Sequence, residues 1–286
     1  MRVGIGLPSG IPGVEGDTIV EWARLAEDGP FASLDTVDRI AYDCYDPLVA
    51  LTAAAAVTSR IALATTILIS PLRNTPLLAK QLASLDRLSG GRLVLGVGLG
   101  AREDDYELAG VDHATRGRRL AGQLVEIAEI FEEGRVGLRT DRHDRPLLLA
   151  GGGSAPAFAR MARHADGYIH GGGPPRAFAR AAEQARAAWI DTGRPGVPAL
   201  WGQAYFAFGD AAERGAAYMR DYYAFTGPFA EKLAAGMLST RQQAIEFLHA
   251  YAEAGCDHLC LMPAVADLDQ LQALAEVVGE AALELA

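Results

Sequence analysis

The sequence has few of the features that mark secreted, membrane-spanning or nucleic-acid-binding proteins. Three cysteines in 286 residues are too few for a disulfide framework. No apolar run approaches the roughly 20 residues that cross a bilayer, and the N-terminal MRVGIGLPSG predicts a strand rather than a signal peptide. The net charge of −10 disfavours a nucleic-acid backbone as partner. We therefore expect a cytoplasmic globular protein with no nucleic-acid and no membrane partner.

The motifs of several enzyme classes are also missing. No HExxH, no P-loop and no Ser-His-Asp set is visible, so the sequence lacks support for metalloprotease or nucleophilic hydrolase chemistry. The stretch Gly96-Val-Gly-Leu-Gly100 has a misplaced third glycine and no acidic residue about 20 positions on, which disfavours a nicotinamide-binding Rossmann site. Cys256, His258 and Cys260 alternate and would share one face of a strand. We favour packing over a metal site for them and predict no metal.

The sequence does contain a repeated strand–helix pattern. Residues 61–70 and 92–99 are continuous Ile, Leu and Val-rich runs, which is typical of strands buried on both faces of a parallel sheet. Between them, Thr75–Leu88 carries apolar residues at a helical period. Strand, helix and strand together form one βαβ unit. The Gly-rich turn after the second strand lies where such a unit places its ligand.

The same alternation continues along the whole chain. Asp17 is expected to cap the first helix, and Asp46-Pro47 to begin the second. Eight strands are expected near residues 3, 35, 64, 95, 148, 168, 204 and 260, each followed by a helix. This regularity predicts an α/β fold, a closed (β/α)8 TIM barrel that forms a single domain over residues 1–286. The aromatic-rich segment Tyr222–Met237 interrupts the pattern and could be a lid or a packed helix pair.

Glycine runs follow several of the expected strands. They are Gly96–Gly100, Gly151–Gly153 and Gly171–Gly173. In a barrel the site lies at these strand ends, where glycine lets backbone N–H groups approach an anion. Gly151-Gly-Gly-Ser154 is the best candidate for a phosphate cradle, although glycines there could merely turn the chain. Arg116 at the start of a helix is poorly placed for the helix dipole, so it either meets an anion or is simply solvated.

Six motifs spread over most of the chain match one enzyme superfamily. They are Asp46-Pro-Leu-Val-Ala-Leu51, Thr58-Ser-Arg-Ile-Ala-Leu63, Pro76-Leu-Leu-Ala-Lys-Gln81, Leu85-Asp-Arg-Leu-Ser-Gly-Gly-Arg92, Leu95-Gly-Val-Gly98 and Ala162-Arg-His-Ala-Asp-Gly167. Any one of them is weak, but together they are strong. With them the chain resembles the luciferase-like flavin monooxygenases, the superfamily that includes bacterial luciferase and the coenzyme F420-dependent oxidoreductases. The family fold is a (β/α)8 barrel.

The resemblance implies a redox cofactor, FMN or F420, across the C-terminal mouth of the barrel. A non-prolyl cis peptide at Thr66-Ile67 would support its ring system, and the loop Gly98–Ala101 would contact it through the backbone. Arg116 with Gly152, Gly153 and Ser154 would hold its phosphate. The cofactor-binding residues implied in this way are Thr65, Thr66, Ile67, Gly98, Gly100, Ala101, Arg116, Gly152, Gly153, Ser154 and Gly171.

Two positions depart from the family pattern. Many F420-dependent dehydrogenases of the family have Asp-His at the end of the second strand, with a catalytic His, whereas this chain has Asp38-Arg39. They often have an acid after the glycines of the fourth strand, where this chain has Ala101. Arginine is always protonated and cannot act as a general base. We predict Asp38 and Arg39 as the catalytic pair, with Arg39 orienting a substrate or stabilising an anionic reduced flavin; a local ion pair between the two is the alternative.

Three functions are compatible with these residues. The first is a monooxygenase that uses reduced FMN, supplied by a separate flavin reductase, and O2 on a small organic substrate. The second is an F420-dependent reductase or dehydrogenase that transfers hydride. The third is a non-catalytic barrel that binds flavin. The resemblance also implies a homodimer formed through the helices after strands two and three. Tyr222, Tyr223, Phe225 and Phe229 could line an apolar pocket.

Overall fold

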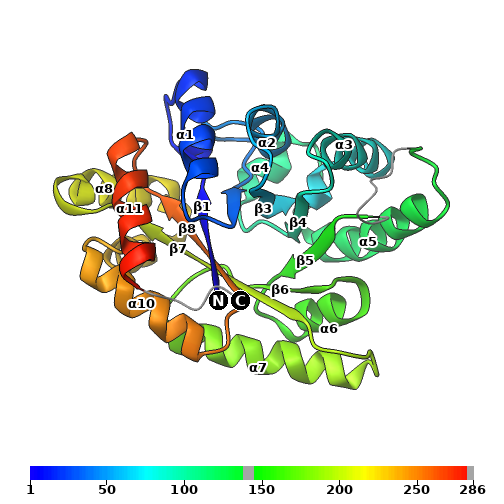
Figure 1. The fold of residues 1–286 in the computed structure, drawn as a ribbon. Coiled ribbons are helices and arrows are strands. Elements are labelled where there is room, and N and C mark those ends of the chain that lie inside the picture. The colour runs from blue at the N-terminus through cyan, green and yellow to red at the C-terminus, as the bar shows by residue number, and fades with distance from the viewer. Residues whose placement is uncertain (138–144, 282–286) are drawn as a thin grey trace.

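Eight parallel strands close into a barrel in the computed structural model, which describes residues 1–137 and 145–281. Each strand pairs with the next in the chain, and β8 returns to β1 (Figure 1). This confirms the predicted (β/α)8 fold, and each predicted strand position lies within a strand. The strands are β1 Arg2–Gly6, β2 Ser33–Thr36, β3 Ala62–Ile69, β4 Leu93–Gly98, β5 Leu147–Gly151, β6 Gly167–Ile169, β7 Ala199–Phe206 and β8 His258–Pro263.

Helices surround the barrel and cover its outer face (Figure 1). They alternate with the strands as the apolar periodicity predicted, and the expected helix Thr75–Leu88 has those bounds. The described residues contain no helix that combines the length and the apolar character needed to cross a membrane. The helices are α1 Gly16–Asp28, α2 Pro47–Ala55, α3 Thr75–Leu88, α4 Glu103–Leu108, α5 Arg116–Glu132, α6 Ala155–His164, α7 Pro175–Asp191, α8 Ala212–Tyr222, α9 Phe229–Ala235, α10 Arg241–Glu253 and α11 Leu268–Glu280.

The helix starts show which capping predictions hold. Asp46 caps α2, since its Oδ1 accepts hydrogen bonds from the backbone N–H groups of Leu48 at 2.9 Å and Val49 at 3.1 Å. Asp17 does not cap α1, contrary to our expectation, because the helix begins one residue earlier and Asp17 lies inside its first turn. There its negative charge is still favourable for the helix dipole.

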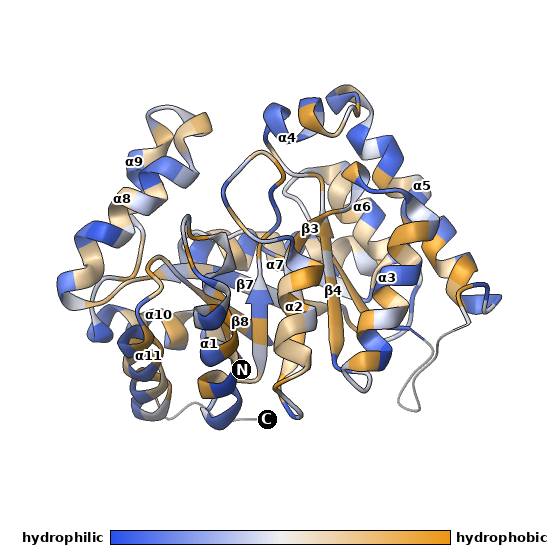
Figure 2. Cartoon of the chain, turned by 90° about the horizontal axis from the view of Figure 1, so that it is seen from above, coloured by the Kyte–Doolittle hydropathy of each residue, from blue (hydrophilic) through white to orange (hydrophobic). Residues whose placement is uncertain are grey.

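Both the α8–α9 pair and α4 rise beyond the end of the barrel that carries the strand C-termini, whereas the N-terminus lies at the other end (Figure 2). Side chains from other loops hold the segment after α8 in place. Arg102 donates a hydrogen bond to the backbone O of Tyr222, and its guanidinium lies 4.2 Å from the ring centre of Phe225. The hydroxyl of Tyr42 donates to the carboxylate of Asp221 at 2.5 Å. The aromatic-rich segment Tyr222–Met237 therefore holds one α-helix, α9, which packs against α8 at the mouth of the barrel.

A buried polar cluster lies inside the barrel, near its N-terminal end. The Ser33 hydroxyl donates to Asp35 Oδ2 at 2.5 Å and lies 2.8 Å from His258 Nε2. His258 stacks on Trp201 with ring centres 3.8 Å apart. Gly4 makes room for the cluster, because a Cβ at that position would lie 2.1 Å from the Ser33 hydroxyl.

The cysteines near this cluster are buried and are not arranged as one face of a strand. Cys260 lies on β8 with His258, whereas Cys256 precedes the strand by two residues. The thiol of Cys256 lies 3.2 Å from the His258 backbone O, and that of Cys260 lies 3.4 Å from Met262 Sδ. Within the described ranges, no group of three His, Cys, Asp or Glu side chains is arranged to hold a metal ion.

Candidate active site

Asp38 follows β2 and is held by partners from the end of β3 and the segment after it. Its Oδ2 accepts a hydrogen bond from the backbone N–H of Ile69 at 2.8 Å, and both of its oxygens lie 3.0 Å from Arg73 Nη2. Arg73 also binds Asp46 at 2.9 Å. Burial raises the pKa of Asp38, against the opposing attraction of Arg73. The carboxylate thus joins the β2 loop to the end of β3.

Arg39 points to α4 rather than to Asp38. Its Nε donates to Asp105 Oδ2 at 2.7 Å, and its Nη2 donates to Asp104 Oδ2 at 2.9 Å. Asp105 is fully buried, and its other oxygen accepts the backbone N–H groups of Ile40 and Ala41 at 2.8 Å each. Each member of the predicted catalytic pair therefore has an ion-pair partner of its own, and the alternative of a local pair between Asp38 and Arg39 is wrong.

The ends of β3 and β4 pack closely against each other. The Thr65 hydroxyl donates to the backbone O of Gly96 at 2.7 Å. A Cβ at Gly98 would lie 2.8 Å from Cδ1 of Ile67, so glycine is needed for this approach. The peptide bond between Thr66 and Ile67 is cis, at the position that the family resemblance implied. Ala101 is exposed in the loop that follows.

A cavity of about 1000 Å³ opens beside β5, β6 and β7, between these strand ends and helices α7, α9 and α10. Three of the predicted cofactor residues, Gly152, Gly153 and Gly171, line it. Gly152 has a φ of +125°, and a Cβ there would lie 2.7 Å from the Cβ of Ala157 on α6. This glycine therefore keeps the wall of the cavity open in a backbone conformation that other residues rarely adopt.

The other predicted phosphate ligands lie at or near helix starts outside this lining. Ser154 is exposed at the N-cap of α6, and its hydroxyl makes no capping hydrogen bond. Arg116 is the first residue of α5 and donates to the backbone O of His113 at 2.7 Å. Neither Ser154 nor Arg116 is among the described residues that line the cavity. Whether they bind a phosphate stays a prediction.

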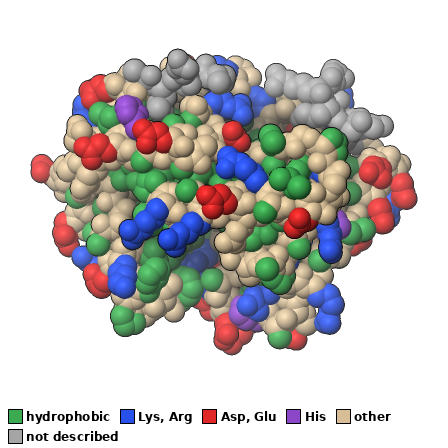
Figure 3. Space-filling view, turned by 90° about the horizontal axis from the view of Figure 1, so that it is seen from below, with side chains coloured by type: hydrophobic (Ala, Val, Ile, Leu, Met, Phe, Trp, Pro, Cys, Tyr) green, Lys and Arg blue, Asp and Glu red, His purple; other side chains and the backbone are tan. Residues whose placement is uncertain are grey.

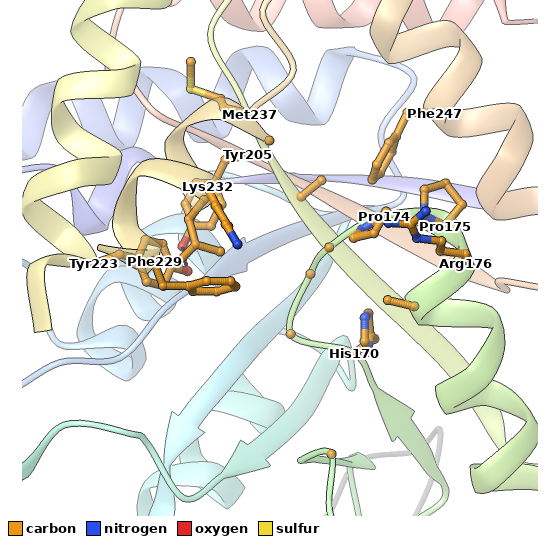
Figure 4. A pocket seen from close by; sticks show the side chains of 18 of the residues that line it. His170, Pro174, Pro175, Arg176, Tyr205, Tyr223, Phe229, Lys232, Met237 and Phe247 are labelled. Carbon is orange, nitrogen blue, oxygen red and sulfur yellow. Dashed lines mark hydrogen bonds between the residues drawn. The ribbon is translucent and has the colours of Figure 1, made fainter. Parts of the chain in front are cut away.

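The structure adds lining residues that our reading of the sequence missed. His170 directly follows β6, and Arg176 lies in the first turn of α7. Lys232 lies on α9, where we had considered only the aromatic residues (Figure 4). The position of His170 at a strand end next to a glycine run was a signal that could have identified it. Of the four aromatic candidates, Tyr223 and Phe229 line the cavity, whereas Tyr222 and Phe225 pack around Arg102.

His170 has a free ring nitrogen in a sheltered position. Its Nδ1 lies 3.3 Å from the Tyr168 hydroxyl, and its Nε2 is buried without a hydrogen-bond partner. Burial lowers the pKa of His170, against a smaller opposing effect of the Gly172 backbone. A lowered pKa favours the neutral ring near pH 7, in which Nε2 is left without a hydrogen-bond partner.

This wall fits the phosphate of a flavin or deazaflavin cofactor. Glycines remove side chains from the strand ends, and α6 and α7 begin directly after them. Backbone N–H groups at a helix start favour an anion. Among the described residues, no Asp or Glu side chain lines the cavity to repel one.

Comparisons with known proteins give a matching family and shared folds. A sequence model of the family described as luciferase-like monooxygenase matches residues 1–255. An uncharacterised protein of Mycobacterium tuberculosis is 32% identical over an alignment of 182 positions, and the match covers 52% of this chain and 63% of that protein. The matched region thus spans less than two thirds of that relative.

Solved structures share the fold at low sequence identity. An F420-dependent secondary alcohol dehydrogenase, solved with an F420-acetone adduct, is 15% identical with a TM-score of 0.82, covering 98% of this chain and 99% of that one. The oxygenating constituent of 3,6-diketocamphane monooxygenase from Pseudomonas putida, solved with FMN, is 16% identical with a TM-score of 0.73, covering 99% of both chains.

Proposed function

Because the chain belongs to the luciferase-like monooxygenase family, we propose that it is a flavin-dependent oxidoreductase, a monooxygenase that uses reduced FMN and O2 on a small organic substrate. The family as a whole includes FMN-binding and F420-binding members, so the choice within it depends on the site rather than on the fold. A cytoplasmic location and a separate flavin reductase as the source of reduced FMN belong to the same proposal.

The arrangement at the end of β2 is the observation that carries this choice. Oxidation of an alcohol by hydride transfer needs a base to take the hydroxyl proton. Arg39 cannot be that base, and Asp38 is occupied by Arg73 and the backbone of Ile69. Monooxygenation places less demand on a protein base at this position, because the bound cofactor supplies the reactive group.

In this proposal the protein's own residues bind, orient and exclude water. The cofactor phosphate would accept hydrogen bonds from the backbone N–H groups of Gly152, Gly153 and Gly171. The ring system of the cofactor would contact the ends of β3 and β4. The α8–α9 pair and the loops joined to it by Arg102 would shield the site from water. Asp38 and Arg39 would act by positioning the β2 loop, and contact between Arg39 and substrate or flavin stays a prediction.

Hydride transfer with F420 is the second candidate. An F420-dependent alcohol dehydrogenase and an FMN-binding monooxygenase both share the fold, so the fold favours neither cofactor. His170 offers a neutral ring nitrogen in the cavity that could accept a proton. The third candidate is a non-catalytic flavin-binding barrel, which would bind the cofactor and turn over no substrate.

Titration of the protein with FMN and with F420 tests the proposal directly. We expect reduced FMN to bind without O2, followed by protein fluorescence, and to give an oxygenated product once both O2 and a substrate are added, followed by mass spectrometry. Tight F420 binding together with no FMN binding would contradict the monooxygenase proposal and favour hydride transfer. Binding of flavin with no turnover on any substrate would favour the non-catalytic barrel.

Replacing Gly152 with valine is expected to weaken cofactor binding at least tenfold. The valine would have to adopt a φ of +125° and would clash with Ala157, so the wall of the cavity would shift. Gly122→Val is the matched control, because a Cβ there meets no atom within 4 Å and the position, on α5, lies outside the cavity lining. Cofactor affinity is measured by fluorescence titration. Equal affinities for the two variants would exclude this wall as the phosphate site.

A second copy of the chain is the proposed partner at α2 and α3, as the family resemblance implies. Val49 on α2 is 64% exposed and Leu77 on α3 is 58% exposed, and they present apolar side chains next to an Ala-rich face. Light scattering on the purified protein is expected to give the mass of a dimer. The double variant Val49→Glu/Leu77→Glu is expected to give the mass of a monomer and to keep the melting temperature of the wild type.

A further inference from the structure

The cavity beside β6 and β7 combines an apolar wall with two cationic side chains. Tyr205, Tyr223, Phe229 and Met237 form the apolar side, and Lys232 extends from α9 between them and the facing wall (Figure 4). Arg176 lies on that facing wall with Pro174 and Pro175. Figure 3 shows Lys and Arg side chains gathered beside a hollow on the side of the molecule that carries α7 and α10.

Neither cationic side chain is used elsewhere in the structure. Within the described part of the chain, the side chains of Lys232 and Arg176 make no hydrogen bond and no ion pair. Glu231, the neighbour of Lys232, binds Arg220 at 3.1 Å instead. Acidic residues exceed basic ones by ten in the whole chain, whereas among the described residues no acidic side chain lines this cavity. Cations that face an apolar cavity are suited to a ligand that brings its own negative charge.

We propose that this cavity binds the substrate, an apolar ring-containing molecule with one anionic group, and that Lys232 and Arg176 bind the anion. The inference rests on the proposed function, because it names the substrate class of the same site. The volume of about 1000 Å³ suits a molecule of two or three rings. The aromatic side chains from β7 and α9 supply the contact surface for the rings.

His170 supports the same assignment from a third direction. His170 lines the cavity and its Nε2 is buried without a hydrogen-bond partner, and a neutral imidazole nitrogen suits a polar substituent of the ligand. The glycine wall provides backbone N–H groups for the cofactor, whereas Lys232 comes from α9, a separate segment. The substrate anion and the cofactor phosphate would therefore have different ligands.

A pair of dyes that differ by one anionic group tests the proposal. The probes are 8-anilinonaphthalene-1-sulfonate and N-phenyl-1-naphthylamine, which share the apolar rings and differ by the sulfonate. Their dissociation constants are measured by fluorescence with and without bound FMN. We expect the protein to bind the sulfonate at least tenfold more tightly, since a charge-assisted hydrogen bond contributes about tenfold or more to affinity.

Lys232→Met and Arg176→Met are each expected to weaken sulfonate binding about tenfold and to leave the neutral dye unchanged. Arg180→Met, one turn further along α7 and outside the lining, is the matched control and is expected to change neither. All three side chains are exposed, so melting temperatures should stay unchanged.

Two results would overturn the inference. A sulfonate preference that is absent, or that persists in the Lys232→Met/Arg176→Met double variant, would show that these cations do not bind an anion. Displacement of the dye by FMN, with weaker FMN binding in Lys232→Met, would assign the anion to the cofactor instead. Failure of the proposed function is distinguishable, because the protein would then bind the sulfonate as expected and bind no flavin at all.

Discussion

Replacing Arg39 with methionine is expected to lower the free energy of unfolding by about 3–5 kcal/mol, the usual cost of leaving one partner of a buried ion pair unpaired. Asp105 is fully buried, and Arg39 Nε, 2.7 Å away, is its cationic partner. Without the guanidinium, the Asp105 carboxylate keeps only the backbone N–H groups of Ile40 and Ala41. Urea denaturation of wild type and variant measures the loss.

The neighbouring aspartate supplies the control for this prediction. Asp104 also binds Arg39, but its side chain is 55% exposed, so Asp104→Asn should cost no more than about 1 kcal/mol. The double variant Arg39→Met/Asp105→Asn should recover much of the lost stability, because no charge is then left buried. A loss below about 1 kcal/mol for Arg39→Met would contradict the buried pair.

The same double variant separates the two roles considered for Arg39. If the residue only positions the β2 loop, a folded double variant should retain turnover. If Arg39 contacts the substrate or the flavin, turnover should fall sharply while the melting temperature stays near that of wild type. The measurement therefore decides whether Arg39 is a catalytic residue.

Replacing Asp35 with asparagine is expected to stabilise the protein at pH 8 by about 4 kcal/mol and to have little effect at pH 4. Burial raises the pKa of Asp35 from 3.8 to about 7, and the Ser33 hydroxyl and the Cys260 thiol offset only part of this effect. Each unit of pKa shift corresponds to about 1.4 kcal/mol. Because the folded pKa is raised, the contribution of this carboxyl to stability is complete below pH 3.8 and is lost as pH rises through 7.

His258 acts in the opposite direction, which hides the effect of Asp35 in the wild type. Burial, with a smaller effect from the charge of Arg2, lowers the pKa of His258 to about 3. The folded protein therefore loses stability from this residue as pH falls below 6.5. Between about pH 4 and 6.5 each state carries one proton on this pair, on Asp35 when folded and on His258 when unfolded. The two contributions to the pH dependence then cancel.

The difference between variant and wild type isolates the carboxyl, because the contribution of His258 is common to both. Urea denaturation at half-unit steps from pH 4 to pH 8 should give a difference that grows steadily up to about pH 7. Asp28→Asn, which alters an exposed carboxylate at the end of α1, should give no such trend. A pH-independent difference for Asp35→Asn would mean that Asp35 ionises normally.

Local patterns in the sequence were enough to predict the architecture. Continuous apolar runs marked the buried strands, and apolar residues at a helical period marked the helices between them. Both patterns arise because residues a few positions apart in a helix or strand lie on the same face. They are therefore visible in a short window of sequence. Asp46-Pro47 predicted the start of α2 for the same reason, since a cap and its partners are adjacent in the chain. The misplaced cap at Asp17 reflects the limited precision of helix ends.

The site required contacts between distant residues, which no local pattern encodes. Arg39 meets Asp105 across 66 residues, and the Ser33 hydroxyl meets His258 across 225. Closing the barrel brings β8 next to β1 and so places His258 near Ser33, whereas Arg39 meets Asp105 because the segments after β2 and β4 lie together at the mouth. The adjacent residues Asp38 and Arg39 thereby have separate partners.

By itself, the sequence determined the eight strands, the helices between them and the glycine-rich ends of the strands, because backbone preference and burial act over short distances. Only the tertiary structure decided which of those ends share a cavity and which cations face it without a partner. Gly152, His170 and Lys232 come from three different segments, and it is the closure of the barrel and the packing of α9 over its mouth that place them around one space.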